Sequence, residues 1–208
     1  MKTVVLTVNM APAVYQLQSN GLVAVPTETV YGLSANGLNP EAVEKLYEIK
    51  GRPETKPINL LVAGLEAAEP YCPDMPAACR LLADAFWPGP LTMIVKKGPA
   101  IPDIVTAGGP TVGIRCPDHP LTLSLLRSCG IPLATPSANI SGQPSPKTAE
   151  EVLAYFNGKI PYVIDGGPCA VGVESTILDM TVTPPRILRQ GGLPRQAIEQ
   201  VLGCEVEV

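Results

Sequence analysis

The segment KGRPETKP, residues 50–57, places three cations within seven residues. Lys50 stands where an amphipathic helical pattern ends, and a cation is favourable at a helix C-terminus. That reason accounts for one charge only, because Arg52 and Lys56 follow on a short loop. Cations on a rigid loop suit a polyphosphate, whose charge must be neutralised from more than one direction.

Further polar clusters follow apolar runs. The stretch TPSANISG, residues 135–142, comes directly after the run 131–134, and GVEST at 172–176 and RILR at 186–189 add polar groups at strand positions. Ser, Thr and Asn are ordinary turn formers. They are equally hydroxyl and amide donors for a nucleotide, and no single cluster decides between the two readings.

The stretch PTETVYGL, residues 26–33, begins where the apolar run 22–25 ends. It combines two hydroxyls, a carboxylate and a phenol. On its own, the stretch favours a strand end followed by a turn.

Several motifs of well-known enzyme classes are absent from the sequence. There is no GxxxxGK[ST], GxGxxG or GxSxG, and the one histidine, His119, favours a capping or surface role. A P-loop ATP site is therefore excluded, and a single histidine leaves little room for a Ser-His-Asp arrangement. The six cysteines form no CxxC pair, so we expect no metal site and interpret them as buried thiols.

Composition indicates a globular protein, with 46% hydrophobic and 16% charged residues among 208. A net charge of −4 argues against a long non-specific contact with nucleic acid, which requires many Lys and Arg contacts. The N-terminus does not have the pattern of a signal peptide, and no run approaches the ~20 apolar residues of a membrane span. We expect a soluble, cytoplasmic protein that does not bind membranes.

The elements that must position these clusters are short. Apolar runs bounded by Gly, Pro, Asn or Asp predict strands, at residues 3–8, 22–25, 58–62, 91–95, 111–116, 131–135, 162–165, 175–179 and 186–189. Helical patterns with capping signals predict helices, at residues 40–50, 76–86, 119–129, 149–157 and 194–202. Because strands and helices alternate irregularly, we expect an α/β fold with a twisted mixed parallel and antiparallel sheet flanked by helices. We expect one domain over residues 1–208, with no additional C-terminal domain.

Seven segments occur in a characteristic order: PTETVYGL, KGRPETKP, WPGPLT, TVGIRCPDHP, TPSANISGQPSPKT, GVEST and RILRQG. Together they closely resemble the YrdC-like family of threonylcarbamoyl-AMP synthases, over roughly residues 7–202. The resemblance implies a YrdC-like fold with a concave basic pocket. It also implies a reaction that joins L-threonine, bicarbonate or CO2, and ATP into threonylcarbamoyl-adenylate and pyrophosphate, for threonylcarbamoyl-adenosine modification of tRNA position 37.

The resemblance also implies roles for individual residues. Lys50 and Arg52 would be the catalytic cations. The residues that would contact ATP are Arg52, Lys56, Thr111, Ser137, Asn139, Ser145 and Arg189. The residues that would contact L-threonine are Thr29, Tyr31, Arg115, Thr135 and Ser175. Thr27 and Glu28 would lie on the same pocket floor or serve the turn itself. Mg2+ would enter with ATP, held by phosphate oxygens and water.

One position departs from the family pattern, because Leu61 stands where many relatives have a histidine near the threonine pocket. The resemblance implies two macromolecular partners: tRNA, bound weakly, and a downstream threonylcarbamoyl-transferase complex.

Two alternative functions stay open. One is a carbamoyl-adenylate-forming domain of the hydrogenase-maturation type, and the other is a non-catalytic RNA-binding module.

Overall fold

A computed structural model describes residues 2–208. Its strands form one sheet in the order β1-β8-β2-β3-β7-β4-β6-β5-β9-β10. Their bounds are β1 Val4–Leu6, β2 Val23–Val25, β3 Gly32–Asn36, β4 Leu60–Leu61, β5 Leu91–Lys96, β6 Thr111–Arg115, β7 Leu133–Ala134, β8 Tyr162–Ile164, β9 Thr176–Asp179 and β10 Arg186–Arg189. The sheet is mixed, as predicted: β4 pairs with β6 in parallel, whereas β7 is antiparallel to both β3 and β4.

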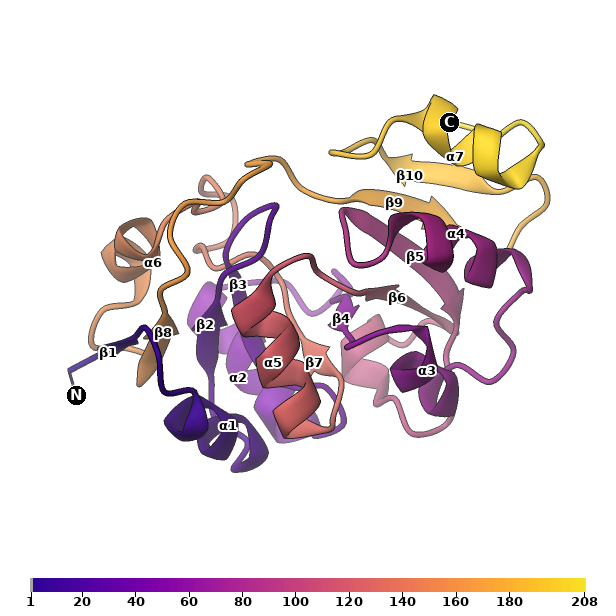
Figure 1. The fold of residues 1–208 in the computed structure, drawn as a ribbon. Helices are drawn as coiled ribbons and strands as arrows, with labels where there is room; N and C mark the ends of the chain where they lie inside the picture. The colour runs from indigo at the N-terminus through magenta and orange to yellow at the C-terminus, as the bar shows by residue number, and fades with distance from the viewer. Residues whose placement is uncertain (1) are drawn as a thin grey trace.

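Helices flank this sheet (Figure 1). Their bounds are α1 Ala11–Gln18, α2 Pro40–Lys50, α3 Leu65–Ala68, α4 Ala78–Phe86, α5 Pro120–Cys129, α6 Ala149–Phe156 and α7 Arg195–Leu202, with short 3-10 turns at Glu69–Tyr71 and Asp103–Thr106. β1 and β10 are the two edge strands. The two chain termini therefore lie at opposite ends of the sheet (Figure 1).

Alternation along the strands divides the buried apolar residues into two clusters. Ala24, Leu60 and Ala134 belong to the larger cluster, whereas Val25 and Leu133 belong to the smaller one. Successive side chains of a strand point to opposite faces of a sheet, so β2, β4 and β7 each contribute to both clusters.

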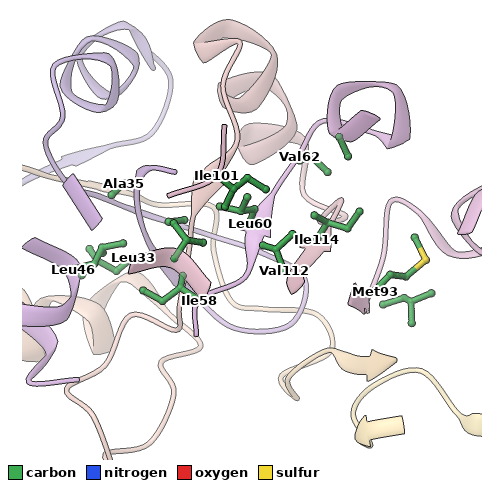
Figure 2. Packing of buried hydrophobic residues seen from close by; sticks show 14 of the residues in the cluster. Leu33, Ala35, Leu46, Ile58, Leu60, Val62, Met93, Ile101, Val112 and Ile114 are labelled. Atoms are coloured by element: carbon green, nitrogen blue, oxygen red, sulfur yellow. The ribbon is translucent and has the colours of Figure 1, made fainter. Parts of the chain in front are cut away.

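Each cluster is closed by different helices. Ala13 and Leu17 of α1 and Leu125 of α5 cover the smaller cluster. Leu46 of α2 packs in the larger cluster, where Figure 2 shows it beside Leu33 of β3. The central strands, and the loops that leave them, are thus held between two helical layers.

Local signals explain the bounds of the two best-capped helices. The Asn39 side chain accepts a hydrogen bond from the Ala42 N–H at 2.9 Å, and Gly51 ends α2 in the left-handed region at φ 56°. Thr148 accepts from the Glu151 N–H at 3.3 Å at the start of α6, while the Glu151 carboxylate accepts from the Lys147 N–H. The predicted ends of both helices are confirmed within one residue.

Two central elements were not predicted. Strand β3 consists of Gly, Leu, Ser, Ala and Asn, a composition with little intrinsic strand preference. It forms because it pairs with β2 on one side and β7 on the other. Helix α1 buries only Ala13 and Leu17, four residues apart, which is too sparse a pattern to predict a helix.

The prediction of buried thiols is correct for four cysteines and wrong for Cys204, which is exposed after the last helix, while Cys169 is half-buried. All six, which fall within the described residues, are free. Desolvation raises the pKa of Cys72 to about 12 and that of Cys79 to about 11. These two thiols are therefore protonated at neutral pH and unreactive as nucleophiles.

Candidate active site

A cavity of about 160 Å³ opens among loops that leave the central strands. Its lining comes from segments far apart in the sequence: Thr27, Thr29, Val30, Gly32, Arg52, Pro57, Ile58, Asn59, Leu61, Arg115, Thr135, Pro136, Ser137, Glu174, Ser175 and Arg189. Three arginines and one carboxylate are among these residues. Anions are therefore the ligands that the lining favours.

The first wall of the cavity is the loop between β2 and β3. The Thr27 hydroxyl accepts hydrogen bonds from the N–H groups of Thr29 and Val30 and donates to the Val30 carbonyl at 2.7 Å. It also lies 2.9 Å from the Thr29 hydroxyl. Thr27 thus builds the turn that presents Thr29 to the cavity.

Tyr31 points away from the cavity. Its hydroxyl donates to the Gly167 carbonyl at 2.8 Å and accepts from the Gly166 N–H at 3.2 Å, and the residue is fully buried. Desolvation raises the Tyr31 pKa to about 12. The phenol therefore anchors the loop after β8 to the start of β3.

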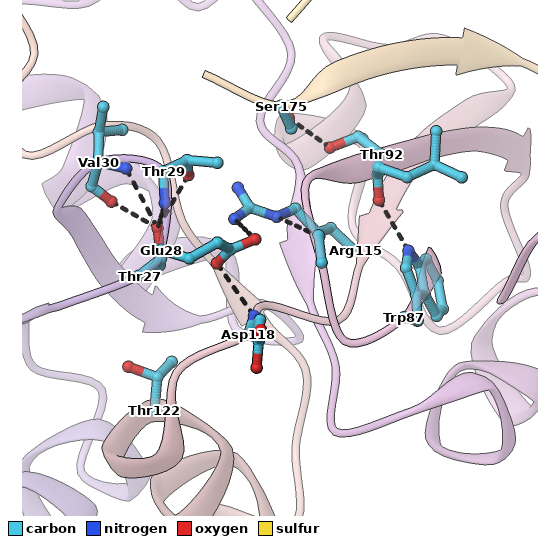
Figure 3. A network of polar contacts seen from close by, with 12 residues as sticks. Thr27, Glu28, Thr29, Val30, Trp87, Thr92, Arg115, Asp118, Thr122 and Ser175 are labelled. Atoms are coloured by element: carbon cyan, nitrogen blue, oxygen red, sulfur yellow. Dashed lines mark hydrogen bonds and ion pairs between the residues drawn. The ribbon is translucent and has the colours of Figure 1, made fainter. Parts of the chain in front are cut away.

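Arg115, the last residue of β6, lies on the second wall. Its Nη2 is 2.7 Å from Oε1 of Glu28, and both side chains are at least nine-tenths buried. Its Nε donates to the Gly89 carbonyl at 3.2 Å, and the other Glu28 oxygen accepts from the Asp118 N–H at 3.0 Å. Figure 3 shows Arg115 between the Thr27–Val30 turn and the pair formed by Thr92 and Ser175.

Arg189, the last residue of β10, lies over Ser175. Its Nε and Nη2 donate to the Ser175 carbonyl at 3.1 and 2.8 Å, and Nη2 also reaches the Ser175 hydroxyl at 3.2 Å. The Ser175 hydroxyl is 2.8 Å from that of Thr92 (Figure 3). These contacts fix the guanidinium at the cavity wall.

Hydrogen bonds within the KGRPETKP segment hold its loop together. Arg52 donates from Nε to the Lys56 carbonyl at 3.2 Å and from Nη2 to the Pro57 carbonyl at 2.8 Å, so its guanidinium holds the loop at the cavity rim. Burial lowers the Arg52 pKa from its ordinary value. The Lys56 side chain is exposed and lies outside the described lining.

Lys50 is buried and is not among the residues that line the cavity. Its Nζ donates to the backbone carbonyls of Ser137 and Asn139, and the residue is 1% exposed. Desolvation, with a smaller contribution from the neighbouring charge of Arg52, lowers the Lys50 pKa to about 7. In this structure Lys50 supports the turn that carries Ser137.

Asn139 and Thr111 also lie outside the lining. The Asn139 Oδ1 accepts from the Ser137 hydroxyl at 2.5 Å, and its Nδ2 donates to the Gln143 carbonyl at 2.6 Å. Thr111 begins β6, where it pairs with Lys96 of β5.

Ser145 lines a second pocket, of about 480 Å³. One hydrogen bond connects Ser145 with Glu174, which lines the first cavity. The Ser145 hydroxyl donates to the Glu174 carboxylate at 2.8 Å, and this bond lowers the Glu174 pKa. The cavity thus brings together seven of the thirteen residues to which the family resemblance assigns a catalytic or binding role, namely Thr29, Arg52, Arg115, Thr135, Ser137, Ser175 and Arg189.

Two features of the site were not predicted from the sequence. Glu28 pairs with Arg115 across 87 residues of chain, and Asn59 lines the cavity above Gly113, where a Cβ would lie 2.2 Å from Asn59 Oδ1. A glycine inside the apolar strand segment TVGIR was the available signal for such a close approach. Leu61 is 3% exposed and lines the same cavity.

Comparisons with known proteins agree on one family. A family model described as Telomere recombination, which covers Sua5, YciO and YrdC proteins, matches residues 15–191. The chain is 46% identical over 187 residues to a threonylcarbamoyl-AMP synthase of Pyrococcus abyssi, covering 90% of this chain and 55% of that protein. It is 47% identical over 195 residues to the Bacillus subtilis threonylcarbamoyl-AMP synthase, covering 93% and 56%. The chain therefore spans about half the length of these curated relatives.

The fold also matches a solved structure. The crystal structure of P. abyssi Sua5 complexed with L-threonine superimposes with a TM-score of 0.95 at 42% identity, covering 99% of this chain and 63% of that one. Sequence and structure thus agree over nearly all of this chain. The chain belongs to the Sua5/YciO/YrdC family.

Proposed function

We propose that the protein synthesises threonylcarbamoyl-AMP from L-threonine, bicarbonate or CO2, and ATP, with release of pyrophosphate. The observation that carries this proposal is the convergence of Arg52, Arg115 and Arg189 on one cavity that Thr29 and Ser175 also line. Such a site offers cations for two anionic substrates and hydroxyls for a small polar one. The names of the two curated relatives and the L-threonine complex of P. abyssi Sua5 support the same reaction.

The amino-acid end of the cavity would be the wall formed by Arg115. The Arg115 guanidinium has the donor geometry for a carboxylate, and Thr29, Thr135 and Ser175 surround it with hydroxyls. Tyr31 would contribute indirectly, because its hydroxyl is bonded to the 166–167 backbone.

The nucleotide end would be the wall formed by Arg52 and Arg189. Ser137 lines the same cavity, and Asn139 Oδ1 accepts a hydrogen bond from the Ser137 hydroxyl. The remaining proposed ATP contacts, Lys56, Thr111 and Ser145, are not among the residues that line the cavity. They would contact the part of the nucleotide that extends beyond the cavity, because the cavity volume of about 160 Å³ is too small for a whole ATP molecule.

The chemistry that this arrangement supports requires no side-chain nucleophile. L-Threonine and bicarbonate condense to a carbamate with loss of water. The carbamate oxygen then attacks the α-phosphorus of ATP, the bond from that phosphorus to the bridging oxygen breaks, and pyrophosphate leaves. Arg52 and Arg189 would stabilise the charge on the leaving group, which is catalysis by positioning and electrostatics. Lys50 would contribute by holding the turn that carries Ser137.

Other components of the proposal rest on the family. Mg2+ would accompany ATP on its phosphate oxygens. Within residues 2–208, no group of three or more His, Cys, Asp or Glu side chains is arranged to hold a metal ion.

We propose a cytoplasmic location, weak tRNA binding and delivery of the product to a threonylcarbamoyl-transferase complex. None of the described helices has the length and apolar character needed to cross a bilayer.

Pyrophosphate release from ATP, with each other substrate omitted in turn, tests this function. We expect release to require both L-threonine and bicarbonate. Release supported by carbamoyl phosphate without threonine would instead indicate a carbamoyl-adenylate-forming enzyme. Absence of release, together with RNA binding that weakens steeply as salt rises, would indicate an RNA-binding module.

A further inference from the structure

The carboxylate of Glu28 lies behind Arg115. Glu28 lies outside the described lining of the cavity, whereas Arg115 lies in it. The two side chains are 7% and 9% exposed, so their ion pair is shielded from solvent screening. A buried arginine without a counter-charge is strongly unfavourable, so the placement of Arg115 depends on Glu28.

The contact has an unusual geometry. Arg115 Nη2 and Glu28 Oε1 are 2.7 Å apart, yet neither atom has an aligned hydrogen-bond partner among residues 2–208. Charge, more than a directed hydrogen bond, therefore holds the pair together. The Gly89 carbonyl fixes the Nε end of the same guanidinium. A guanidinium carries five N–H donors, so the remaining donors stay free for a ligand in the cavity.

Glu28 itself is held from three sides. Its second carboxylate oxygen accepts from the Asp118 N–H at 3.0 Å, and its backbone carbonyl accepts from the Val171 N–H at 2.7 Å. Thr27, next to it, forms the turn of the same loop. The carboxylate cannot follow Arg115 if the guanidinium rotates, and it therefore defines one orientation of that group.

We propose that Glu28 is a positioning residue, which orients the Arg115 guanidinium so that its free donors meet the carboxylate of the amino-acid substrate. This inference rests on the proposed function, because it assigns the amino-acid end of the cavity to Arg115. Glu28 touches no substrate in this assignment. Its negative charge also opposes the substrate carboxylate, and orientation outweighs that repulsion because bidentate pairing needs the guanidinium in one plane.

Two substitutions of Glu28 separate positioning from simple structural support. Glu28→Gln keeps the volume and an oxygen that can accept from the Asp118 N–H, but it removes the charge that holds Arg115. Glu28→Asp keeps the charge and withdraws it by one methylene. In pyrophosphate-release assays we expect each to raise KM for L-threonine roughly tenfold, with KM for ATP changed less than about twofold.

Asp118→Ala is the matched control, because Asp118 contributes only its backbone N–H and its side chain is exposed. It should leave both KM values unchanged. A wild-type KM for L-threonine in folded Glu28→Gln would overturn the positioning role, as would an equal rise in both KM values. If Glu28→Gln fails to fold, Glu28→Asp decides by the same criteria. A wild-type protein without threonine-dependent release would overturn the proposed function itself, which distinguishes the two failures.

Discussion

Lys50, the last residue of α2, donates from its Nζ to the backbone carbonyls of Ser137 and Asn139, 87 and 89 residues further along the chain. One buried cation thereby ties the helix before the KGRP loop to the loop after β7. The carbonyl acceptors carry no charge of their own. Burial therefore determines the protonation of Lys50, and its pKa falls to about 7.

Stability should respond to this shift. Between pH 7 and the ordinary Lys pKa of 10.5, the unfolded chain keeps the Lys50 proton that the folded chain releases. The unfolded state binds more protons in this window, so the free energy of unfolding rises with pH. Relative to Lys50→Met, the wild type should gain on the order of 2 kcal/mol between pH 7 and 9 in urea titrations.

Lys45→Met on the same helix is the control, because Lys45 is exposed, and it should keep the wild-type profile. Parallel wild-type and Lys50→Met profiles would mean that the two carbonyls keep the ammonium charged throughout.

Removal of the Arg52 side chain should impair turnover while leaving the fold intact. Its guanidinium lines the cavity and holds the Lys56 and Pro57 carbonyls. We expect Arg52→Ala to lower pyrophosphate release at least about tenfold, since the cation that we propose stabilises the leaving group is lost. Arg80→Ala, which breaks only exposed ion pairs with Glu66 and Glu69, should retain normal turnover. Near-normal turnover of Arg52→Ala would contradict the site assignment.

The close approach of Gly32 to Thr135 gives a steric prediction. A Cβ on Gly32 would lie 2.3 Å from Thr135 Cγ2, so Gly32→Ala must displace Thr135 from the cavity wall. We expect KM for L-threonine to rise roughly tenfold, a loss of about 1.4 kcal/mol in binding. Gly21→Ala, whose Cβ meets only the end of the flexible Gln16 side chain, should behave as wild type. Equal KM values in the two variants would argue against a threonine contact at Thr135.

The fork that Arg189 makes over Ser175 should not tolerate lysine. Arg189→Lys keeps the charge but cannot donate to the Ser175 carbonyl and hydroxyl in the same plane. Turnover at saturating substrates should fall roughly tenfold, which corresponds to about 1.4 kcal/mol in activation free energy. The control is Arg186→Lys on the same strand, since Arg186 pairs at the surface with Glu207. Similar turnover in both variants would show that charge alone is required at position 189.

The predictable parts of the fold are those encoded by local signals. Asn39 and Gly51 mark both ends of α2, and the alternation of apolar residues marks the strands that run through the core. Strand β3 could not be predicted in this way, because Gly32 to Asn36 gains its strand geometry from two neighbouring strands that lie far apart in sequence. Tertiary pairing there outweighs local preference.

In the candidate site, too, local sequence signals predicted some features and tertiary contacts determine the others. Residue types and order singled out Arg52, Arg115 and Arg189, and the structure brings all three to one cavity. The directions in which the Lys50 and Tyr31 side chains point could not be predicted from the sequence. Each depends on the backbone carbonyls that folding brings within hydrogen-bond distance. The pairing of Arg115 with Glu28 could not be predicted for the same reason. A carboxylate in a turn gives no local sign that it will be buried.

The cavity draws on residues from Thr27 near the start of the chain to Arg189 on the edge strand β10. During synthesis on a ribosome, the arginines of the earlier segments emerge well before the strand that completes the wall. A nascent chain therefore cannot present the full set of cations to an anionic ligand until β10 has left the exit tunnel and paired with β9. The complete cavity can therefore form only after the last strand of the sheet has been translated.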